Sequence, residues 1–258
     1  GVIFVESLDE VPRDTNQPVI FSAHGVAKRV IEKAKNYNLL FYDAICPLVS
    51  KIHKEITFLE SQGFQIIMIG HEGHPEVEGT AGQLKDMDNL TLVQTLPDVE
   101  KLYFSSKQKL AYITQTTLSV LDTQEIVDAL EKKFPEILAP KKSDICYATS
   151  NRQYSVQDMA SKVDAIFVVG AFNSSNSIRL VETAKRYGCS HSELIENVEN
   201  FDYSQLTHFK SIGLTASASA PEEQLDLLIE KIKTKFAVDV TDYKEDENIV
   251  FKVPNFLN

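Results

Sequence analysis

The strongest constraint on the fold of this chain is an internal repeat with a spacing of about 100 residues. Three segments recur in the same order, at offsets of 100, 100 and 101 residues: 43–50 with 143–150, 66–76 with 166–176, and 111–119 with 212–220. The pairs share a cysteine ahead of a helical pattern, a glycine after an apolar run, and a run of small polar residues, respectively. Two copies of one supersecondary unit explain this order. Two unrelated units with the same strand–loop–helix order are the alternative.

Apolar, β-branched runs alternate along the chain with amphipathic segments. Strands are expected at 2–5, 18–23, 39–44, 64–70, 90–94, 109–115, 164–171 and 211–216, with a last one in DENIVFKVP near the C-terminus. Helices are expected at 26–36, 48–62, 76–84, 121–134, 147–162, 175–187 and 220–235. Runs such as FQIIMIG suit strands that are buried on both faces, as in parallel sheets between helices. The sequence therefore predicts an α/β fold with mainly parallel sheets.

A third copy of the repeat is visible only in part. PVIFSAHGV at 18–26 resembles the last feature of the other copies, an apolar strand that ends in a small polar turn. The cysteine of this copy would fall ahead of residue 1, so we expect Gly1 to lie inside a lobe. The repeat predicts three pseudosymmetric lobes around a common centre, the first of them incomplete. The expected divisions are a remnant of the first lobe (1–45), a second lobe (46–141), a third lobe (142–240) and a tail (241–258).

Polar clusters follow five of the expected strands, at the point where a helix begins. They are SAHG (22–25), GHEGHPE (70–76), TQTT (114–117), FNSSNS (172–177) and TASAS (215–219). Ligands of doubly wound α/β units bind at the carboxyl ends of strands, where helix N-termini offer free N–H groups. Any one cluster alone is explained by helix capping. Five at equivalent positions favour a shared anion pocket, with a phosphate or diphosphate as the expected anion.

Two of the three cysteines occupy equivalent positions of the repeat. Cys46 and Cys146 each precede a helical pattern, whereas Cys189 has no counterpart and is expected to be a bystander. A lone cysteine at a strand end is commonly a small buried apolar residue. Pseudosymmetry would bring the two sulfurs to one centre, and a third copy would add a third thiolate. Three cysteine ligands on a cubane iron–sulfur cluster would leave one iron open to substrate.

The segment GHEGHPEVEGT at 70–80 holds a candidate acid–base group. Glu76 lies two residues beyond His74, where a helical pattern starts, and its carboxyl could relay a proton to a bound ligand. The alternative is a first-turn glutamate that complements the helix dipole. We expect His74 to face the ligand and His71 to be structural.

The charge balance bounds the classes of partner. Lys and Arg number 26 and Asp and Glu 37, so the net charge is −11. This excess argues against broad binding to nucleic acid or to anionic membranes, although a local basic pocket is compatible with it. No apolar run reaches the ~18–20 residues of a membrane-spanning helix. Three cysteines do not form a disulfide framework, which favours a reducing interior.

Seven motifs along the chain resemble one known family. In order they are SAHGV, DAICPLVSKIH, GHEGHPEVEGT, TQTTLS, DICYATSNRQ, VVGAFNSSNSIRL and TASASAP. Together they closely resemble the 4-hydroxy-3-methylbut-2-enyl diphosphate reductases, which catalyse the last step of the non-mevalonate isoprenoid pathway. The resemblance runs from residue 1 to the C-terminal ENIVFKVP, and seven ordered motifs make it specific.

The resemblance implies a [4Fe–4S] cluster held by three cysteines in the centre of three lobes. Cys46 and Cys146 would be two of the ligands, and the third is expected upstream of residue 1. Two electrons and two protons would convert the allylic substrate to isopentenyl diphosphate and dimethylallyl diphosphate. Reduced ferredoxin or flavodoxin is the implied electron donor. The implied location is the bacterial cytoplasm, with a plastid as the alternative.

The resemblance also implies roles for individual side chains. Glu76 would deliver protons, and Thr116 would hydrogen-bond near the substrate hydroxyl. The residues implied to hold the diphosphate are His24, His74, Ser174, Ser175, Asn176 and Ser219.

Two other functions are compatible with the same residues. Because residues 1–258 include only two of the three cluster cysteines, the chain could be a non-catalytic or degenerate diphosphate-binding protein of the same fold. A zinc hydrolase could use Cys46, Cys146, His24 and His74, but no two histidines have the spacing of a zinc-binding helix motif. The reductase remains the leading hypothesis.

Overall fold

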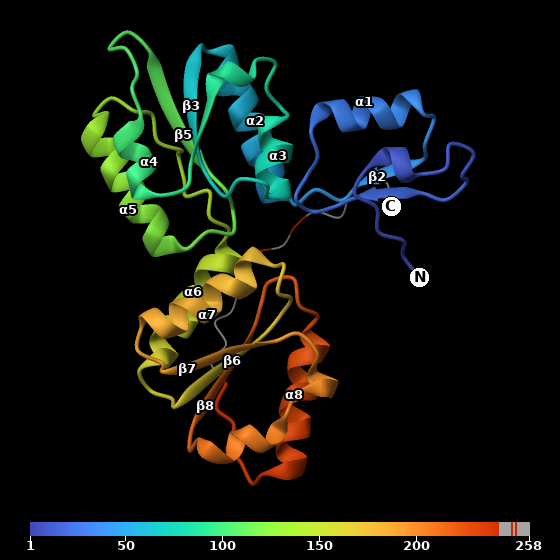
Figure 1. Ribbon diagram of the computed structural model, residues 1–258, viewed down its shortest axis with the longest axis vertical. Coiled ribbons are helices and arrows are strands. Elements are labelled where there is room, and N and C mark those ends of the chain that lie inside the picture. Colours follow the sequence, from blue (N-terminus) through green and yellow to red (C-terminus); the bar gives the residue numbers. More distant parts are fainter. Residues whose placement is uncertain (243–248, 250, 252–258) are drawn as a thin grey trace. The chain divides into compact units, whose positions relative to one another are not determined.

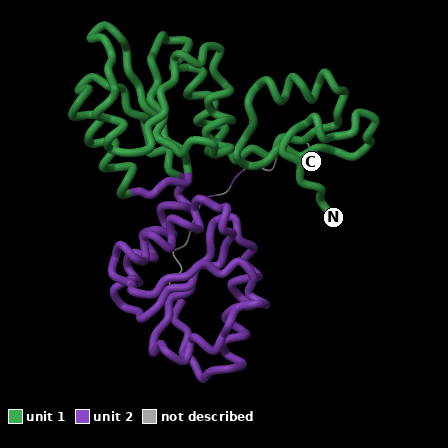
Figure 2. Tube along the Cα trace, viewed as in Figure 1, with its two compact units in different colours: residues 1–116, 121–145 green, residues 117–120, 146–258 purple. Residues whose placement is uncertain are grey.

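A computed structural model describes residues 1–242, 249 and 251 (Figure 1). The chain separates into two compact units, coloured in Figure 2. Unit 1 comprises residues 1–116 and 121–145, and unit 2 comprises 117–120 and 146–258. Every strand pairing between named strands is parallel, as the sequence predicts. Within the described residues, no helix combines the length and the apolar composition that crossing a membrane requires.

The first part of unit 1 is a two-stranded parallel sheet. Strands β1 (Val19–Phe21) and β2 (Phe41–Asp43) are joined through helix α1 (Lys28–Asn36), and a short 3-10 helix, η1 (Leu8–Glu10), precedes them. The small core of this part comprises Leu8, Phe21, Ala34 and Leu39. The strand predicted at 2–5 is wrong: Val2, Ile3 and Phe4 are 77%, 80% and 92% exposed and belong to no strand. An apolar run needs a neighbouring strand to pair its backbone groups, and the described residues provide none there.

The rest of unit 1 is built on a three-stranded sheet of order β4-β3-β5. Its elements are α2 (Pro47–Ser61), β3 (Phe64–Ile69), α3 (Pro75–Ala81), η2 (Met87–Asn89), β4 (Leu90–Val93), α4 (Leu96–Lys101), β5 (Lys109–Thr114) and α5 (Val120–Lys133). The central strand β3 pairs on both sides, and its last four residues, Ile66 to Ile69, are buried. Of these residues, Ile66 and Met68 pack with the apolar face of α2 and with Ala111 and Ile113 of β5 in one core cluster.

Unit 2 contains a sheet of the same kind, of order β7-β6-β8. Its elements are α6 (Tyr147–Ala160), β6 (Ala165–Val169), α7 (Ser175–Arg186), β7 (His191–Ile195), η3 (Val198–Asn200), η4 (Tyr203–His208), β8 (Ile212–Ala216) and α8 (Glu222–Lys235). Every residue of β6 is buried, because helices α6 and α7 contribute to one core cluster and α8 to another. The equal sheet orders, with strands at equivalent sequence positions, confirm the predicted repeat.

One strand and one α-helix were missed by the strand and helix patterns, besides the short 3-10 helices. Strand β7 has the sequence HSELI, whose polar residues hide the strand signal, and α4 is only one and a half turns long. The repeat itself predicts β7, since β4 lies about 100 residues earlier. Most of the strand expected in DENIVFKVP lies outside the described residues. The division at residues 45, 141 and 240 stays a prediction.

The core of unit 2 gives a test of the fold. Phe167 in β6 is fully buried, and its ring packs at 5.3 Å from that of Phe201. Phe167→Ala should lower the free energy of unfolding by about 3–5 kcal/mol through lost contacts and an unfilled cavity. Phe172, which is 64% exposed, is the matched control. Phe172→Ala should change the free energy of unfolding by less than about 0.5 kcal/mol. Urea unfolding followed by circular dichroism measures both, and equal losses would contradict the placement of Phe167.

Candidate functional site

Two histidines that follow strands of different sheets lie close together in unit 1. His24 follows β1, and His74 caps the N-terminus of α3; their rings are 5.4 Å apart and nearly perpendicular. The His74 Nδ1 accepts the Glu76 backbone N–H at 3.2 Å, so its Nε2 is the nitrogen that carries a proton in the neutral ring. Burial, followed by the neighbouring His24, lowers the pKa of His74 to about 4. The pair therefore offers imidazole N–H donors for an anion without a fixed positive charge.

The turn that carries His24 is held by Gly25 and His53. Gly25 adopts a φ of 74°, which favours glycine, and its N–H bonds to the Ser22 carbonyl at 3.1 Å. A Cβ at Gly25 would lie 2.6 Å from His53 Cε1, so the ring of His53 packs directly on the turn. Desolvation lowers the pKa of His53 to about 4, and its buried Nε2 has no hydrogen-bond partner in the part of the chain that the structure describes. His24 is exposed on one side, and desolvation on the other lowers its pKa as well.

A buried carboxyl lies at the carboxyl ends of β3 and β5. Glu76 is 1% exposed; its Oε1 accepts the Thr116 backbone N–H at 2.6 Å and its Oε2 accepts the Thr116 hydroxyl at 2.8 Å. Burial raises the pKa of Glu76 to about 7, although both bonds from Thr116 oppose the rise and Asp144 adds to it. A carboxyl with a pKa near neutrality can both give and accept a proton. Although Glu76 lies in the first turn of α3, its side chain is buried and does not lie at the surface.

Asp144 and Gln115 were not predicted as site residues. The Asp144 carboxylate accepts the Lys51 ammonium at 3.0 Å and the Thr114 backbone N–H at 3.2 Å. Burial raises the pKa of Asp144, and Lys51 opposes that effect. Gln115, fully buried, accepts the His71 backbone N–H at 3.1 Å, which fixes the start of the loop that leads to His74. The sequence held a signal for each: Asp144 lies two residues before the candidate ligand Cys146, and Gln115 lies inside the TQTT cluster.

Both candidate cysteines are N-caps of helices. Cys46 precedes α2 in unit 1, and its backbone N–H bonds to the Ala23 carbonyl at 3.0 Å. Cys146 precedes α6 in unit 2, and its Sγ lies 3.3 Å from the backbone nitrogen and 3.0 Å from the hydroxyl of Thr149. Both thiols are free and partly exposed. Cys189 is buried under β7, where it contacts the carbonyl of His191 at 3.0 Å.

The polar residues after β6 form a second cluster, in unit 2. Ser174 caps α7, and the Ser175 hydroxyl donates to the Thr117 carbonyl at 3.1 Å. Asn176 is 4% exposed, and both polar atoms of its side chain lack a hydrogen-bond partner among the described residues. Ser219 is exposed, and its hydroxyl is 3.4 Å from that of Ser217. Buried amides are nearly always bonded, so Asn176 is suited to a ligand.

Ser177 and Ser217 were missed by the sequence patterns. A Cβ at Gly170 would lie 2.3 Å from the Ser177 hydroxyl and 3.0 Å from that of Ser217. Both serines are buried, and the Ser177 hydroxyl has no partner among the described residues. The glycine that ends β6 therefore makes room for two hydroxyls beside Asn176. Their place inside FNSSNS and TASAS was the available signal.

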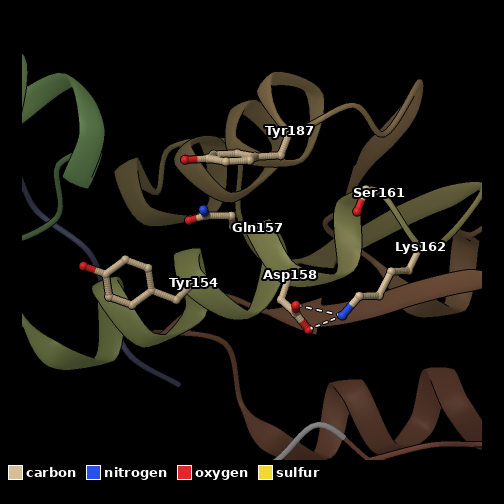
Figure 3. A pocket seen from close by; sticks show the side chains of 6 residues that line it. All are labelled: Tyr154, Gln157, Asp158, Ser161, Lys162 and Tyr187. Carbon is tan, nitrogen blue, oxygen red and sulfur yellow. Dashed lines mark hydrogen bonds and ion pairs between the residues drawn. The ribbon is translucent and has the colours of Figure 1, made fainter.

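A surface hollow of about 410 Å³ lies elsewhere on unit 2, along the outer side of α6 (Figure 3). It is lined by Tyr154, Gln157, Asp158, Ser161, Lys162 and Tyr187. Asp158 and Lys162 form an ion pair at 2.7 Å, drawn in Figure 3. None of the residues predicted from the sequence lines this hollow. Within the described residues, no group of three or more His, Cys, Asp or Glu is arranged to hold a metal ion.

Known proteins resemble this chain over its whole length. The family profile described as "LytB protein" matches residues 1–233. A 4-hydroxy-3-methylbut-2-enyl diphosphate reductase of Beijerinckia indica subsp. indica is 47% identical, across 100% of this chain and 80% of that protein. One from Ruegeria sp. is 48% identical, across 100% and 81%. The solved structure of the E-1-hydroxy-2-methyl-but-2-enyl-4-diphosphate reductase from Plasmodium falciparum has a TM-score of 0.91 at 35% identity, over 100% of this chain and 80% of that chain.

The buried carboxyl makes the stability of unit 1 depend on pH. Because the pKa of Glu76 rises from 4.5 to about 7, the folded chain keeps a proton that the unfolded chain releases between these values. The unfolded state then binds fewer protons, so the free energy of unfolding falls as the pH rises through this range. We expect Glu76→Gln to remove this decline, which is worth roughly 3 kcal/mol. Urea unfolding of both proteins at several pH values measures it; an identical pH dependence would contradict the raised pKa.

Proposed function

The chain belongs to the LytB protein family, and on that premise we propose that it catalyses reductive dehydroxylation of 4-hydroxy-3-methylbut-2-enyl diphosphate. The products are isopentenyl diphosphate and dimethylallyl diphosphate. The substrate takes up two electrons and two protons and loses its hydroxyl oxygen as water. The protein must therefore bind a diphosphate, receive electrons and supply protons at one end of the substrate.

The observation that carries this proposal is the buried pair of Glu76 and Thr116. A carboxyl with a pKa of about 7 holds a proton half of the time at neutral pH and can release it to a leaving hydroxyl. Thr116 donates to both oxygens of that carboxyl, which fixes its orientation in the folded chain. We assign Glu76 the role of proton donor and Thr116 that of a hydrogen-bonding partner near the substrate hydroxyl.

We assign the diphosphate to the polar side chains after the strands. His24 and His74 supply imidazole donors in unit 1, and their T-shaped packing supports a joint role. In unit 2, the Asn176 amide, which has no hydrogen-bond partner among the described residues, and the N-terminus of α7 suit an anion, since the helix offers free N–H groups there. The further residues that we assign to diphosphate binding are Ser174, Ser175 and Ser219.

Cys46 and Cys146 are assigned as ligands of a [4Fe–4S] cluster. Their chemistry fits, because both thiols are free, partly exposed and placed at the N-caps of helices. Thr149 contacts the sulfur of Cys146 through its N–H and hydroxyl, as second-layer donors to cluster sulfurs do. The cluster, when bound, would supply the two electrons.

The electron donor is proposed by chemical class. Single-electron carriers match the chemistry of an iron–sulfur centre, so reduced ferredoxin or flavodoxin is proposed as the partner. Both are compatible with a reducing compartment, and we propose the cytoplasm of a bacterium as the location. The sparse cysteines, none of them in a disulfide, agree with such a compartment.

The cluster assignment is tested by anaerobic reconstitution with iron and sulfide of the protein expressed from its complete gene. We expect visible charge-transfer absorbance and bound iron in the wild type, and loss of most of both in Cys46→Ser and Cys146→Ser, because an alcohol is a poor ligand for iron–sulfur clusters. Cys189→Ser is the matched control and should keep both signals, since Cys189 is buried and its thiol is bonded to the His191 carbonyl. Equal loss in all three variants would contradict the assignment.

The proton-donor role is tested by Glu76→Gln. The amide keeps the size of the side chain and the contact with the Thr116 N–H but cannot release a proton. Turnover of the allylic diphosphate with a chemical reductant should fall by about 10²–10⁴-fold, while substrate affinity changes little. Glu78→Gln, an exposed carboxyl on the same helix, is the control and should leave turnover unchanged. Full activity of Glu76→Gln would remove the proposed role.

A further inference from the structure

Helix α3 contacts the segment after His24 more closely than side chains ordinarily allow. A Cβ at Gly79 would lie 2.7 Å from the Gly25 carbonyl oxygen, and one at Gly82 would lie 2.1 Å from the Ala27 Cβ. Distances under 3.0 Å do not occur for real Cβ atoms, so both positions require glycine. One face of α3 is therefore seated on the backbone of residues 25–27, within unit 1.

The side chain of Gln83 spans this contact. It is 7% exposed, and its Nε2 donates to the Val26 carbonyl at 2.9 Å and to the Gly79 carbonyl at 2.8 Å. Both protons of one amide nitrogen are thus used, one on each side of the contact. The Lys28 N–H adds a bond to the Gly82 carbonyl at 3.2 Å. Two donors satisfied in a buried place make Gln83 a specific bridge and not a space filler.

The bridge lies between the two elements that carry the paired histidines. Val26 is two residues beyond His24, and Gly79 is in the helix whose N-cap is His74. The rings of these histidines are 5.4 Å apart. A shift of α3 along residues 25–27 would change that distance, because each ring is attached to one side of the contact. Glu76 is held differently, by Thr116 at the end of β5.

We infer that Gln83 is a positioning residue that sets the spacing of His24 and His74 and through it the affinity for the diphosphate group. The identity of the ligand in this inference rests on the proposed function. The effect of Gln83 on the spacing of the two rings does not depend on that function. The hydrogen bonds of the Gln83 side chain go to the Val26 and Gly79 carbonyls, so it acts through the backbone of these two segments. Glu76 lies on the same helix as Gly79, but Thr116 holds its carboxyl separately through a backbone N–H and a hydroxyl, so we expect the proton step to change little.

The experiment compares Gln83→Met with a matched control, Gln65→Met. Gln65 also donates from its Nε2 to a backbone carbonyl, that of Asp88 at 2.9 Å, but at the amino end of β3. The first measurement is the imidazole resonances of His24 and His74 by NMR, without ligand. We expect both to shift in Gln83→Met, because the mutual ring-current effect changes with the ring distance, and to stay unchanged in Gln65→Met.

The second measurement is the affinity for inorganic diphosphate by calorimetry. Two lost hydrogen bonds should weaken binding by about 10-fold in Gln83→Met and leave Gln65→Met as the wild type. In steady-state turnover, KM should rise to a similar extent while kcat stays within about twofold. If Gln83→Met does not fold, Gln83→Asn, which keeps an amide but is too short to reach both carbonyls, is used in its place.

The third measurement is a double-mutant cycle with His24→Ala. If Gln83 acts through His24, Gln83→Met should weaken diphosphate binding little further in the His24→Ala background. Full additivity, or resonances of both rings unchanged from the wild type, would overturn the inference. A wild type that does not bind diphosphate would overturn the proposed pocket instead, and the ring resonances would still decide the role of Gln83.

Discussion

The parallel pairing of β3 with β5 is the constraint on which the chemistry of unit 1 depends. The register sets Ile69 opposite Thr114, so the two strands end at the same edge of the sheet. Glu76 reaches this edge from the first turn of α3, and Thr116 reaches it two residues past β5. A buried carboxyl without partners would be costly, but Thr116 gives it two short hydrogen bonds. The fold therefore permits a desolvated acid where its sequence position alone suggests a solvated one.

Desolvation also sets the charge of the site. It raises the pKa of Glu76 to about 7 and lowers that of His74 to about 4, so both groups tend toward neutrality at neutral pH. The net charge of −11 disfavours a diphosphate, and an ionised Glu76 would add to the repulsion. A protonated carboxyl at Glu76 removes that charge, and the neutral imidazoles still offer N–H donors. An anion placed against them would in turn raise the pKa of both imidazoles, because an opposite charge favours the protonated form.

The repeat and the strand ends could be predicted from the sequence because each rests on short-range patterns. Apolar runs identified β3, β6 and their helices, and the 100-residue offset identified equivalent ends. The contacts of Glu76 with Thr116 were not predictable, since they join residues 40 positions apart through a register that no local pattern encodes. The same holds for Gln83, which bonds to a carbonyl 57 residues away. The strand predicted at residues 2–5 was wrong for the opposite reason. The local pattern is that of a strand, but a strand also needs a partner, and pairing depends on the tertiary structure.

The two copies of the repeat use one backbone design for different chemistry. Gly70 ends β3 and Gly170 ends β6, and a Cβ at either position would collide with the first turn of the helix that follows, at Val77 (2.8 Å) or Ser177 (2.3 Å). Glycine at this point lets the helix N-terminus lie close to the strand ends in both copies. The helix then presents His74 and Glu76 in one copy where its counterpart presents Ser174 and Asn176. Because the backbone supplies the same N–H groups in each copy, the side chains are free to diverge. The same backbone therefore carries a carboxyl with a pKa of about 7 at Glu76 in one copy, and at Ser174 and Asn176 in the other copy it carries a hydroxyl and an amide that do not titrate near neutral pH.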